Sequence, residues 1–145
     1  FISYDKWLAS LKTRVHFEKG NDKNKKRILQ LINKTNQMNL STRRISELEL
    51  NKLMKNKNCR LLSCKVSDKF GEMGLVGVVS FKLFSNKIVV IDFILSCRAF
   101  GRSIEKSMLL KIIQILNKKR RRVFTGCLCT LSSEWSKHDA CVVCS

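Results

Sequence analysis

The residues best suited to chemistry lie in the short polar segment 96–103, which follows a long apolar run. Cys97 offers a nucleophilic sulfur, and Arg98 and Arg102 offer guanidinium groups that form charge-assisted hydrogen bonds with phosphate. Gly101 has no side chain, so the backbone there can approach a ligand closely. The segment therefore predicts a phosphate-binding loop. The candidate cofactor-binding residues are Arg98, Gly101, Arg102 and Ser103.

The segments on either side of this loop predict a strand and a helix. Ile88–Leu95 is apolar except for Asp92, as in a strand that is buried on both faces. From residue 104 onward, apolar residues recur at helical spacing. They are Met108, Leu109, Ile112, Ile113 and Leu116. This order places the free N–H groups and positive dipole end of the helix at the end of the strand. The alternative is a core strand and helix joined by a solvated turn.

Cys97 is the candidate catalytic residue. It lies at the predicted strand end, beside Arg98 and the start of the helix, where positive charge favours a thiolate that can form a thioester. The alternative is a small, inert residue of the core, since free cysteines are commonly buried.

The chain before this unit predicts two helices and three strands. Residues 13–17 read as a strand, and Ile28, Leu31, Ile32, Thr35 and Met38 share one helical face. Ser46 and Glu49 form a capping box that opens a second helix. Segments 59–67 and 75–84 read as strands separated by a glycine-bearing turn at 68–74. The second of these strands forms an antiparallel hairpin with Ile88–Leu95, and residues 122–128 predict a further strand, parallel to Ile88–Leu95.

Composition favours one basic globular domain. The chain has 145 residues, of which 44% are hydrophobic and 28% charged, and a net charge of +18. This charge predicts an acidic partner: nucleic acid, an anionic membrane surface, a phosphorylated cofactor or an acidic protein. No apolar run of membrane-spanning length and no signal peptide is recognisable. We therefore expect a cytoplasmic protein whose seven cysteines are reduced.

Several motifs resemble one protein family. Arg98-x-x-Gly101-x-Ser103 resembles the loop with which GNAT acyltransferases hold the pyrophosphate of coenzyme A. TNQMNLSTRR at 35–44 resembles the TNQFNLTTRR signature of FkbH-like proteins, and SCRAFGRSIE at 96–105 is similar to their SCRVFGRGVE stretch. DKFGEMGLVG at 68–77 and the segment 4–11 are also similar to the family. The resemblance covers roughly residues 1–119.

The resemblance implies a GNAT-like α/β fold, a mixed sheet flanked by helices. FkbH-like proteins pair a HAD-type phosphatase domain with a GNAT-like domain. The best understood members load a glyceryl group from a phosphorylated three-carbon metabolite onto an acyl carrier protein. This chain corresponds to the GNAT-like half, because the Asp-x-Asp nucleophile motif of the phosphatase is absent throughout. A HAD-type phosphatase domain, in the same chain or a separate one, is then an expected partner.

The implied function is acyl transfer, or binding of an acyl carrier protein or coenzyme A. It handles a glyceryl or other acyl thioester in polyketide-type or surface-polysaccharide biosynthesis. The phosphate of a phosphopantetheine arm lies on the loop, and its thiol end follows the gap beside Ile88–Leu95. The implied substrate residues at the acyl end are Asn36, Gln37, Asn39 and Arg43. The alternative for this cluster is helix capping and turn hydrogen bonding.

The C-terminal tail departs from the family. We expect a leader at 1–18, a GNAT-like domain at 19–124, incomplete at its end, and an atypical cysteine-rich tail at 125–145. The tail holds ligands suited to zinc, but C-x-C followed by H-x-x-C-x-x-C is not a common zinc spacing, so no metal residue is assigned. A shifted reading frame is the other interpretation. The alternative functions are an inactive truncated fragment, or a nucleic-acid-binding module that uses 118–122 and 43–44.

Overall fold

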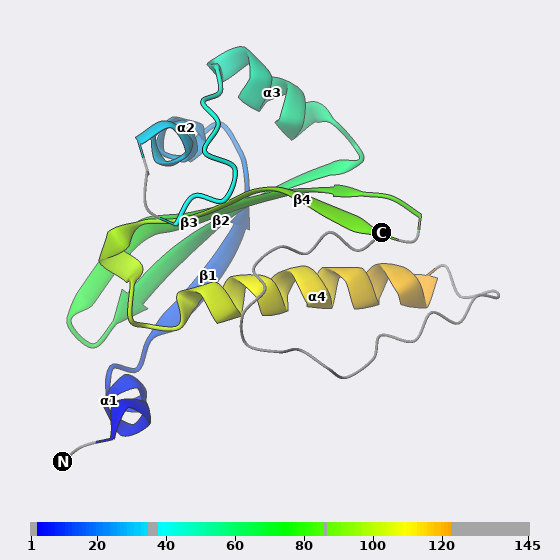
Figure 1. The fold of residues 1–145 in the computed structure, drawn as a ribbon. Helices are drawn as coiled ribbons and strands as arrows, with labels where there is room; N and C mark the ends of the chain where they lie inside the picture. The colour runs from blue at the N-terminus through cyan, green and yellow to red at the C-terminus, as the bar shows by residue number, and fades with distance from the viewer. Residues whose placement is uncertain (1–2, 35–37, 86, 123–145) are drawn as a thin grey trace.

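A computed structural model describes residues 3–34, 38–85 and 87–122, with side chains described to residue 118 (Figure 1). Four α-helices, one short 3₁₀ helix (η1) and four strands follow one another in this part of the chain. They are α1 (Tyr4–Ser10), β1 (Arg14–Lys19), α2 (Lys25–Lys34), α3 (Glu47–Lys55), β2 (Cys59–Asp68), β3 (Gly71–Leu83), β4 (Ile88–Leu95), η1 (Cys97–Ala99) and α4 (Ile104–Arg122).

The four strands form one antiparallel sheet in the order β1-β2-β3-β4. Helices α2 and α3 lie over one face and α4 lies over the other (Figure 1). The expected α/β architecture and the antiparallel pairing of β3 with β4 are therefore confirmed. We expected a parallel strand at 122–128. This prediction is wrong for Arg122, which belongs to α4. Residues 123–128 lie outside the described part of the chain.

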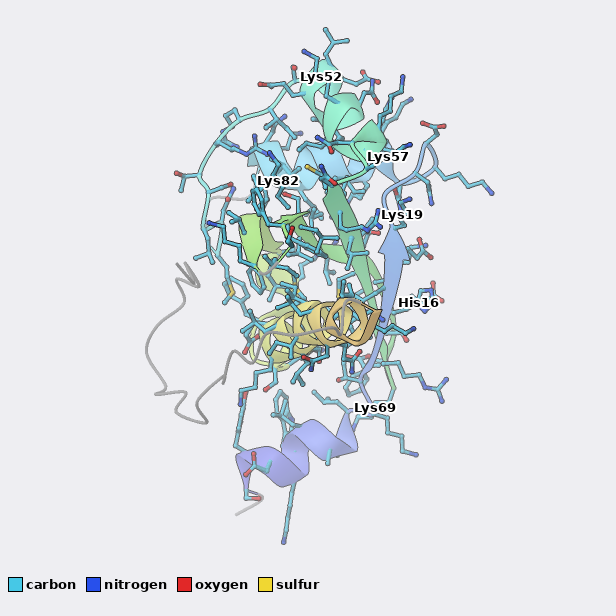
Figure 2. The ribbon with its side chains drawn as sticks, turned by 90° about the vertical axis from the view of Figure 1, so that its right-hand side faces the viewer. His16, Lys19, Lys52, Lys57, Lys69 and Lys82 are labelled. Atoms are coloured by element: carbon cyan, nitrogen blue, oxygen red, sulfur yellow. The ribbon has the colours of Figure 1, made fainter. Side chains whose placement is uncertain are left out.

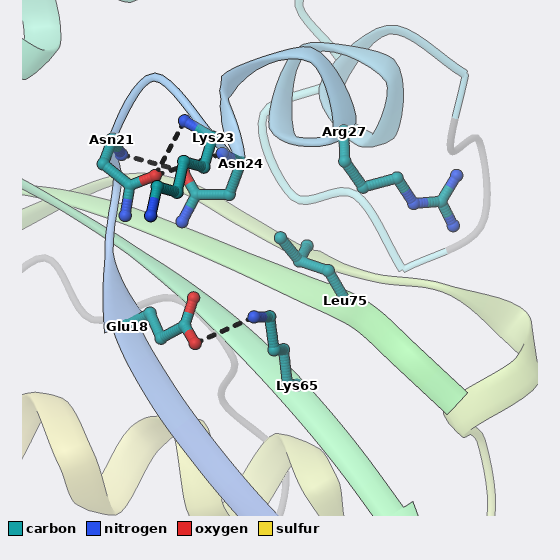
Figure 3. Close-up of a pocket in the computed structure, with 7 residues that line it drawn as sticks. All are labelled: Glu18, Asn21, Lys23, Asn24, Arg27, Lys65 and Leu75. Carbon is teal, nitrogen blue, oxygen red and sulfur yellow. Dashed lines mark hydrogen bonds and ion pairs between the residues drawn. The ribbon is translucent and has the colours of Figure 1, made fainter. Parts of the chain in front are cut away.

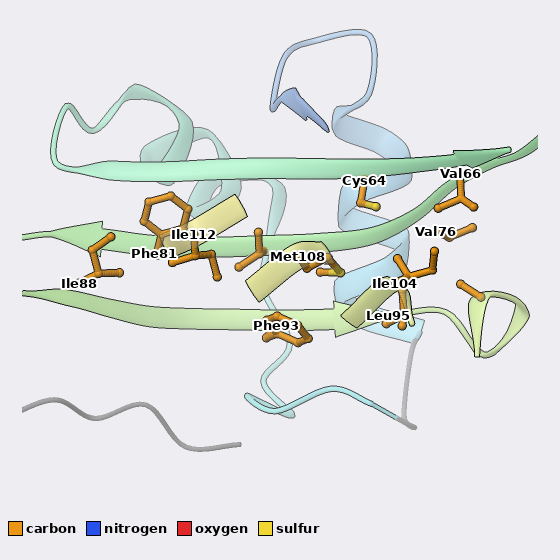
Figure 4. Packing of buried hydrophobic residues seen from close by; sticks show 12 residues of the cluster. Cys64, Val66, Val76, Phe81, Ile88, Phe93, Leu95, Ile104, Met108 and Ile112 are labelled. Carbon is orange, nitrogen blue, oxygen red and sulfur yellow. The ribbon is translucent and has the colours of Figure 1, made fainter. Parts of the chain in front are cut away.

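The face of the sheet toward α4 carries the larger core. Met108 and Ile112 of α4 are buried, as the helical spacing predicts, and Leu116 packs at the edge of the same cluster (Figure 4). The helix approaches closely at Gly77, where a Cβ atom would lie 3.0 Å from the Met108 sulfur and 3.1 Å from Cβ of Cys64. Gly77 therefore sets the distance between α4 and the sheet.

The opposite face is covered by α2 and α3. Ile28, Leu31 and Ile32 of α2 are buried there, as predicted. The capping box also forms, with the Ser46 N–H donating to Glu49 Oε2 at 2.7 Å and the Glu49 N–H to Ser46 Oγ at 3.2 Å.

Several sequence predictions need correction. Helix α2 ends at Lys34, so Met38 does not continue its buried face and is 38% exposed. The turn expected at 68–74 shortens to two residues, because Asp68 pairs with Gly71 and the strands extend toward each other. Strand β4 is not buried along its whole length: Val89 is 39% exposed.

The sheet also begins earlier than the expected domain start at residue 19. Strand β1 pairs with β2 over all six of its residues, from Arg14 to Lys19. The strand predicted at 13–17, within the segment expected as a leader, is therefore confirmed, with its bounds at Arg14–Lys19.

Positive charge is spread over many elements. Figure 2 labels lysines that extend from α3 at one end of the molecule to the β2–β3 turn at the other. These are Lys19, Lys52, Lys57, Lys69 and Lys82. The charge therefore identifies no single binding face by itself.

Candidate functional site

The loop between β4 and α4 is anchored by its backbone. The Ser96 N–H donates to the Val76 carbonyl at 2.7 Å, and Ala99 in η1 is fully buried. Gly101 and Ser103 have φ angles of +75° and +56°, which turn the chain into α4. A Cβ atom on Gly101 would meet no described atom within 4 Å. Glycine is thus favoured at 101 by its backbone conformation, not by crowding within the protein.

The two arginines of the loop differ in their surroundings. Arg102 forms an ion pair with Asp68 at 2.8 Å, which ties the loop to the β2–β3 turn. Hydrogen bonds from the Phe70 N–H and Arg102 lower the pKa of Asp68 below its usual value, against the opposing effect of burial. Arg98 is exposed, and its guanidinium group has no partner among the described residues. Arg98 is therefore the cation of this loop that can reach a ligand without breaking an ion pair.

Tyr4 reaches the same loop from α1. Its hydroxyl donates a hydrogen bond of 2.8 Å to the carbonyl of Gly101, 97 positions away in sequence. Its ring stacks on Trp7, with the ring centroids 5.9 Å apart. Because Tyr4 and Gly101 are so far apart in the sequence, no local pattern indicates this contact.

Helix α4 begins directly after the loop. The first N–H groups of a helix have no carbonyl partner within it, and α4 is 19 residues long. Cys97 lies next to Arg98 in η1 and is exposed, unlike the inert buried cysteine of the alternative interpretation. An exposed cysteine and an exposed arginine thus lie in the segment that leads into the first turn of α4.

The predicted substrate residues that the structure describes belong to a buried ionic network on β4. Arg43 donates two hydrogen bonds of 2.8 Å to the carboxylate of Asp92, which is completely buried. Ser41 Oγ also donates to this carboxylate, at 2.9 Å, and Ser80 Oγ donates to it from β3. Asn39 joins the network through Ser41 Oγ, which lies 3.2 Å from Asn39 Oδ1. Asn36 and Gln37 lie outside the described residues.

The network determines the charge state of Asp92. Burial by itself raises the pKa of a carboxyl group, but the hydrogen bonds from Arg43, Ser80 and Ser41 outweigh burial and leave the pKa of Asp92 lowered. In the sequence, Asp92 is the one charged residue of an apolar strand. A carboxylate buried in such a strand needs a cation or hydrogen-bond donors, so Asp92 indicates an ionic partner but does not identify Arg43.

The segment around Asn39 also lies along the free edge of β4. The Leu40 N–H donates to the Phe93 carbonyl at 3.2 Å, and the Leu95 N–H donates to the Met38 carbonyl at 3.1 Å. These contacts take up the backbone groups of β4 nearest to the loop. A ligand that follows this edge must displace residues 38–40 or pass over them.

The described residues include no group of three or more His, Cys, Asp or Glu side chains placed to hold a metal ion. The tail cysteines and His138 lie outside them. None of the helices in the described ranges combines the length and apolar character needed to cross a membrane.

Comparison with known proteins gives the chain no assignment. No protein-family model matches it, and no match is found among curated proteins. The function is therefore inferred from the residues of the loop and their surroundings.

Proposed function

We propose that the loop between β4 and α4 binds the phosphate of a phosphopantetheine arm, carried by coenzyme A or by an acyl carrier protein. The observation that carries the proposal is Arg98, which is exposed, has no ion-pair partner among the described residues, and lies in the loop that leads into the long helix α4. The helix supplies N–H donors and a positive dipole end, and the guanidinium group adds a full charge.

The order of elements supports a GNAT-like domain similar to that of FkbH-like proteins. Two helices separate β1 from β2, three antiparallel strands follow, and the loop leads into a helix on the other face of the sheet. This is the order expected from the resemblance. Acyl carrier proteins are acidic, so they suit a chain with a net charge of +18.

The catalytic role of Cys97 stays a prediction. Its exposed thiol lies in the loop proposed for the phosphate, whereas the thioester is at the other end of the phosphopantetheine arm. Acyl transfer to Cys97 therefore requires a second placement of the arm, with its thioester at the loop. If a Cys97→Ser variant transfers acyl groups at the wild-type rate, the Cys97 thiol is not the nucleophile.

Arg43 and Asn39 have a positioning role in this proposal. They hold the segment 38–44 against β4 through Asp92, beside the expected path of the arm. Contact of Asn36, Gln37, Asn39 and Arg43 with the acyl group stays a prediction.

Calorimetric titration with coenzyme A tests the proposal. Arg98→Ala removes one charge-assisted phosphate contact, worth about 1.5–3 kcal/mol, so affinity falls roughly ten- to a hundredfold. The matched control is Lys55→Ala, which removes an exposed cation at the end of α3 and leaves affinity unchanged. Equal affinity of the wild type and Arg98→Ala contradicts the proposal. Binding of arbitrary DNA instead of coenzyme A, with a steep dependence on salt, would favour the nucleic-acid alternative.

A further inference from the structure

A cleft lies on the α2 side of the sheet (Figure 3), whereas α4 covers the other side (Figure 1). Its volume is about 450 Å³, within the usual range of small-molecule sites. The start of α2 forms its upper wall, and strands β1, β2 and β3 form its base (Figure 3). The lining residues are Glu18, Asn21, Lys23, Asn24, Arg27, Lys65 and Leu75.

The base of this cleft is fixed by buried contacts. Asn24 is 7% exposed, and its amide nitrogen donates to the Lys19 carbonyl and to Ser63 Oγ, each at 3.2 Å. Its amide oxygen accepts from the Asn21 N–H at 2.8 Å. Leu75 is also 7% exposed and adds an apolar surface between the polar groups. Asn24 and Leu75 therefore form a preformed base.

The rim of the cleft carries excess positive charge. Lys23, Arg27 and Lys65 contribute three cations against the single carboxylate of Glu18. Glu18 and Lys65 form an ion pair at 2.8 Å, and the hydrogen bond from Lys65 lowers the pKa of Glu18. Lys23 has no ionic partner among the described residues. Arg27 donates one hydrogen bond, to Gln30 at 2.7 Å, and keeps further N–H groups for a ligand.

We infer that this cleft binds a small phosphate monoester that carries hydroxyl groups, such as a sugar phosphate. A phosphate monoester has a charge of about −1.5 to −2 near neutral pH, which matches the excess of two cations on the rim. The Arg27 guanidinium fork contacts the phosphate oxygens, and Lys23 adds positive charge on the other side of the cleft. Glu18 accepts hydrogen bonds from ligand hydroxyl groups, and Leu75 contacts the carbon skeleton. This site is separate from the loop between β4 and α4.

NMR titration of the full chain with glucose 6-phosphate tests the inference, with glucose and inorganic phosphate as comparison ligands. Glucose 6-phosphate shifts the resonances of Asn21, Asn24 and Arg27 saturably, and it binds more tightly than either comparison ligand. Arg27→Gln weakens its binding by about tenfold or more, as expected for a lost charge-assisted phosphate contact. Lys26→Gln removes an exposed cation of the same helix that does not line the cleft, and leaves affinity within about twofold.

A second variant separates recognition of hydroxyl groups from attraction of charge. Glu18→Gln removes a negative charge and frees Lys65 from its ion pair, so the affinity for inorganic phosphate rises. The variant also loses the carboxylate that accepts hydrogen bonds from ligand hydroxyl groups, so the ratio of the affinities for glucose 6-phosphate and inorganic phosphate falls. Equal affinities of Arg27→Gln and Lys26→Gln would overturn the inference. The inference would also be overturned if glucose 6-phosphate bound no more tightly than inorganic phosphate, or if it shifted only the resonances of the loop after β4. None of these outcomes depends on whether coenzyme A binds.

Discussion

At the scale of single residues, the pair of Arg43 and Asp92 is the centre of the hydrogen-bonded network on β4. Asp92 is fully buried in β4, and Arg43 comes from the segment that precedes α3. Removal of one partner from such a pair leaves a charge without compensation, which costs far more than the pair itself contributes. The pair therefore holds the segment 38–44 in one arrangement against the sheet.

Arg43→Ala tests this pair. The variant leaves the buried carboxylate of Asp92 without its cation, so the free energy of unfolding falls by about 1.5–3 kcal/mol, less than for a fully buried pair because the Arg43 side chain is 35% exposed. Arg14→Ala, which removes an exposed arginine from edge strand β1, changes stability by less than about 0.5 kcal/mol. Urea denaturation followed by circular dichroism measures both variants. Similar urea midpoints of unfolding for the two variants would show that Arg43 does not stabilise the buried Asp92 carboxylate.

The same pair predicts a dependence of stability on pH. The pKa of Asp92 is lower in the folded protein than in the unfolded chain, where a carboxyl group titrates near about 3.9. The stabilisation is therefore complete above that value and is lost as the pH falls through the lower pKa of the folded state. Asp92→Asn flattens the decline in unfolding free energy below about pH 4. An equally steep acid decline in Asp92→Asn would contradict this assignment.

At the scale of secondary structure, the site depends on how closely α4 packs on β3. A Cβ atom added to Gly77 would meet both the Met108 sulfur and Cβ of Cys64, the residue paired with Gly77 on β2. Burial also raises the pKa of the Cys64 thiol to about 12, so this cysteine is a neutral core residue in the physiological range. The position of the α4 N-terminus, and with it the loop, follows from this contact.

Gly77→Val is expected to push α4 away from the sheet. Added atoms in a packed core cost about 1–3 kcal/mol, and the thermal midpoint falls accordingly. Met108→Ala in the same chain opens space beside residue 77, so the double variant is more stable than the sum of the two single changes predicts. Strict additivity of the two changes would show that the close contact at Gly77 does not limit the packing.

Most elements could be predicted because their patterns are local. The spacing of Ile28, Leu31 and Ile32 defines α2, and the capping box defines the start of α3. The contacts that complete the site could not be predicted, because they join distant positions. Tyr4 and Gly101 are 97 positions apart, and no local signal specifies their hydrogen bond.

At the scale of the whole molecule, the net positive charge attracts anions over a longer distance than the loop, which acts only on a ligand in contact with it. The net charge of +18 attracts any polyanion at low salt, since exposed charges act over about 10 Å at 0.1 M ionic strength. Attraction of this kind does not select a ligand. Selection requires contact at a defined place, and we propose that this place is Arg98 and the start of α4.

The most direct measurement is therefore an NMR titration of the wild-type chain with coenzyme A at about 0.15 M salt, where long-range attraction is screened. We predict saturable shifts of the Gly101, Ile104 and Glu105 amides, with half-saturation at a roughly ten- to hundredfold higher coenzyme A concentration in Arg98→Ala. Shifts dispersed over the exposed lysines, or shifts at the loop that persist unchanged in Arg98→Ala, would contradict this prediction.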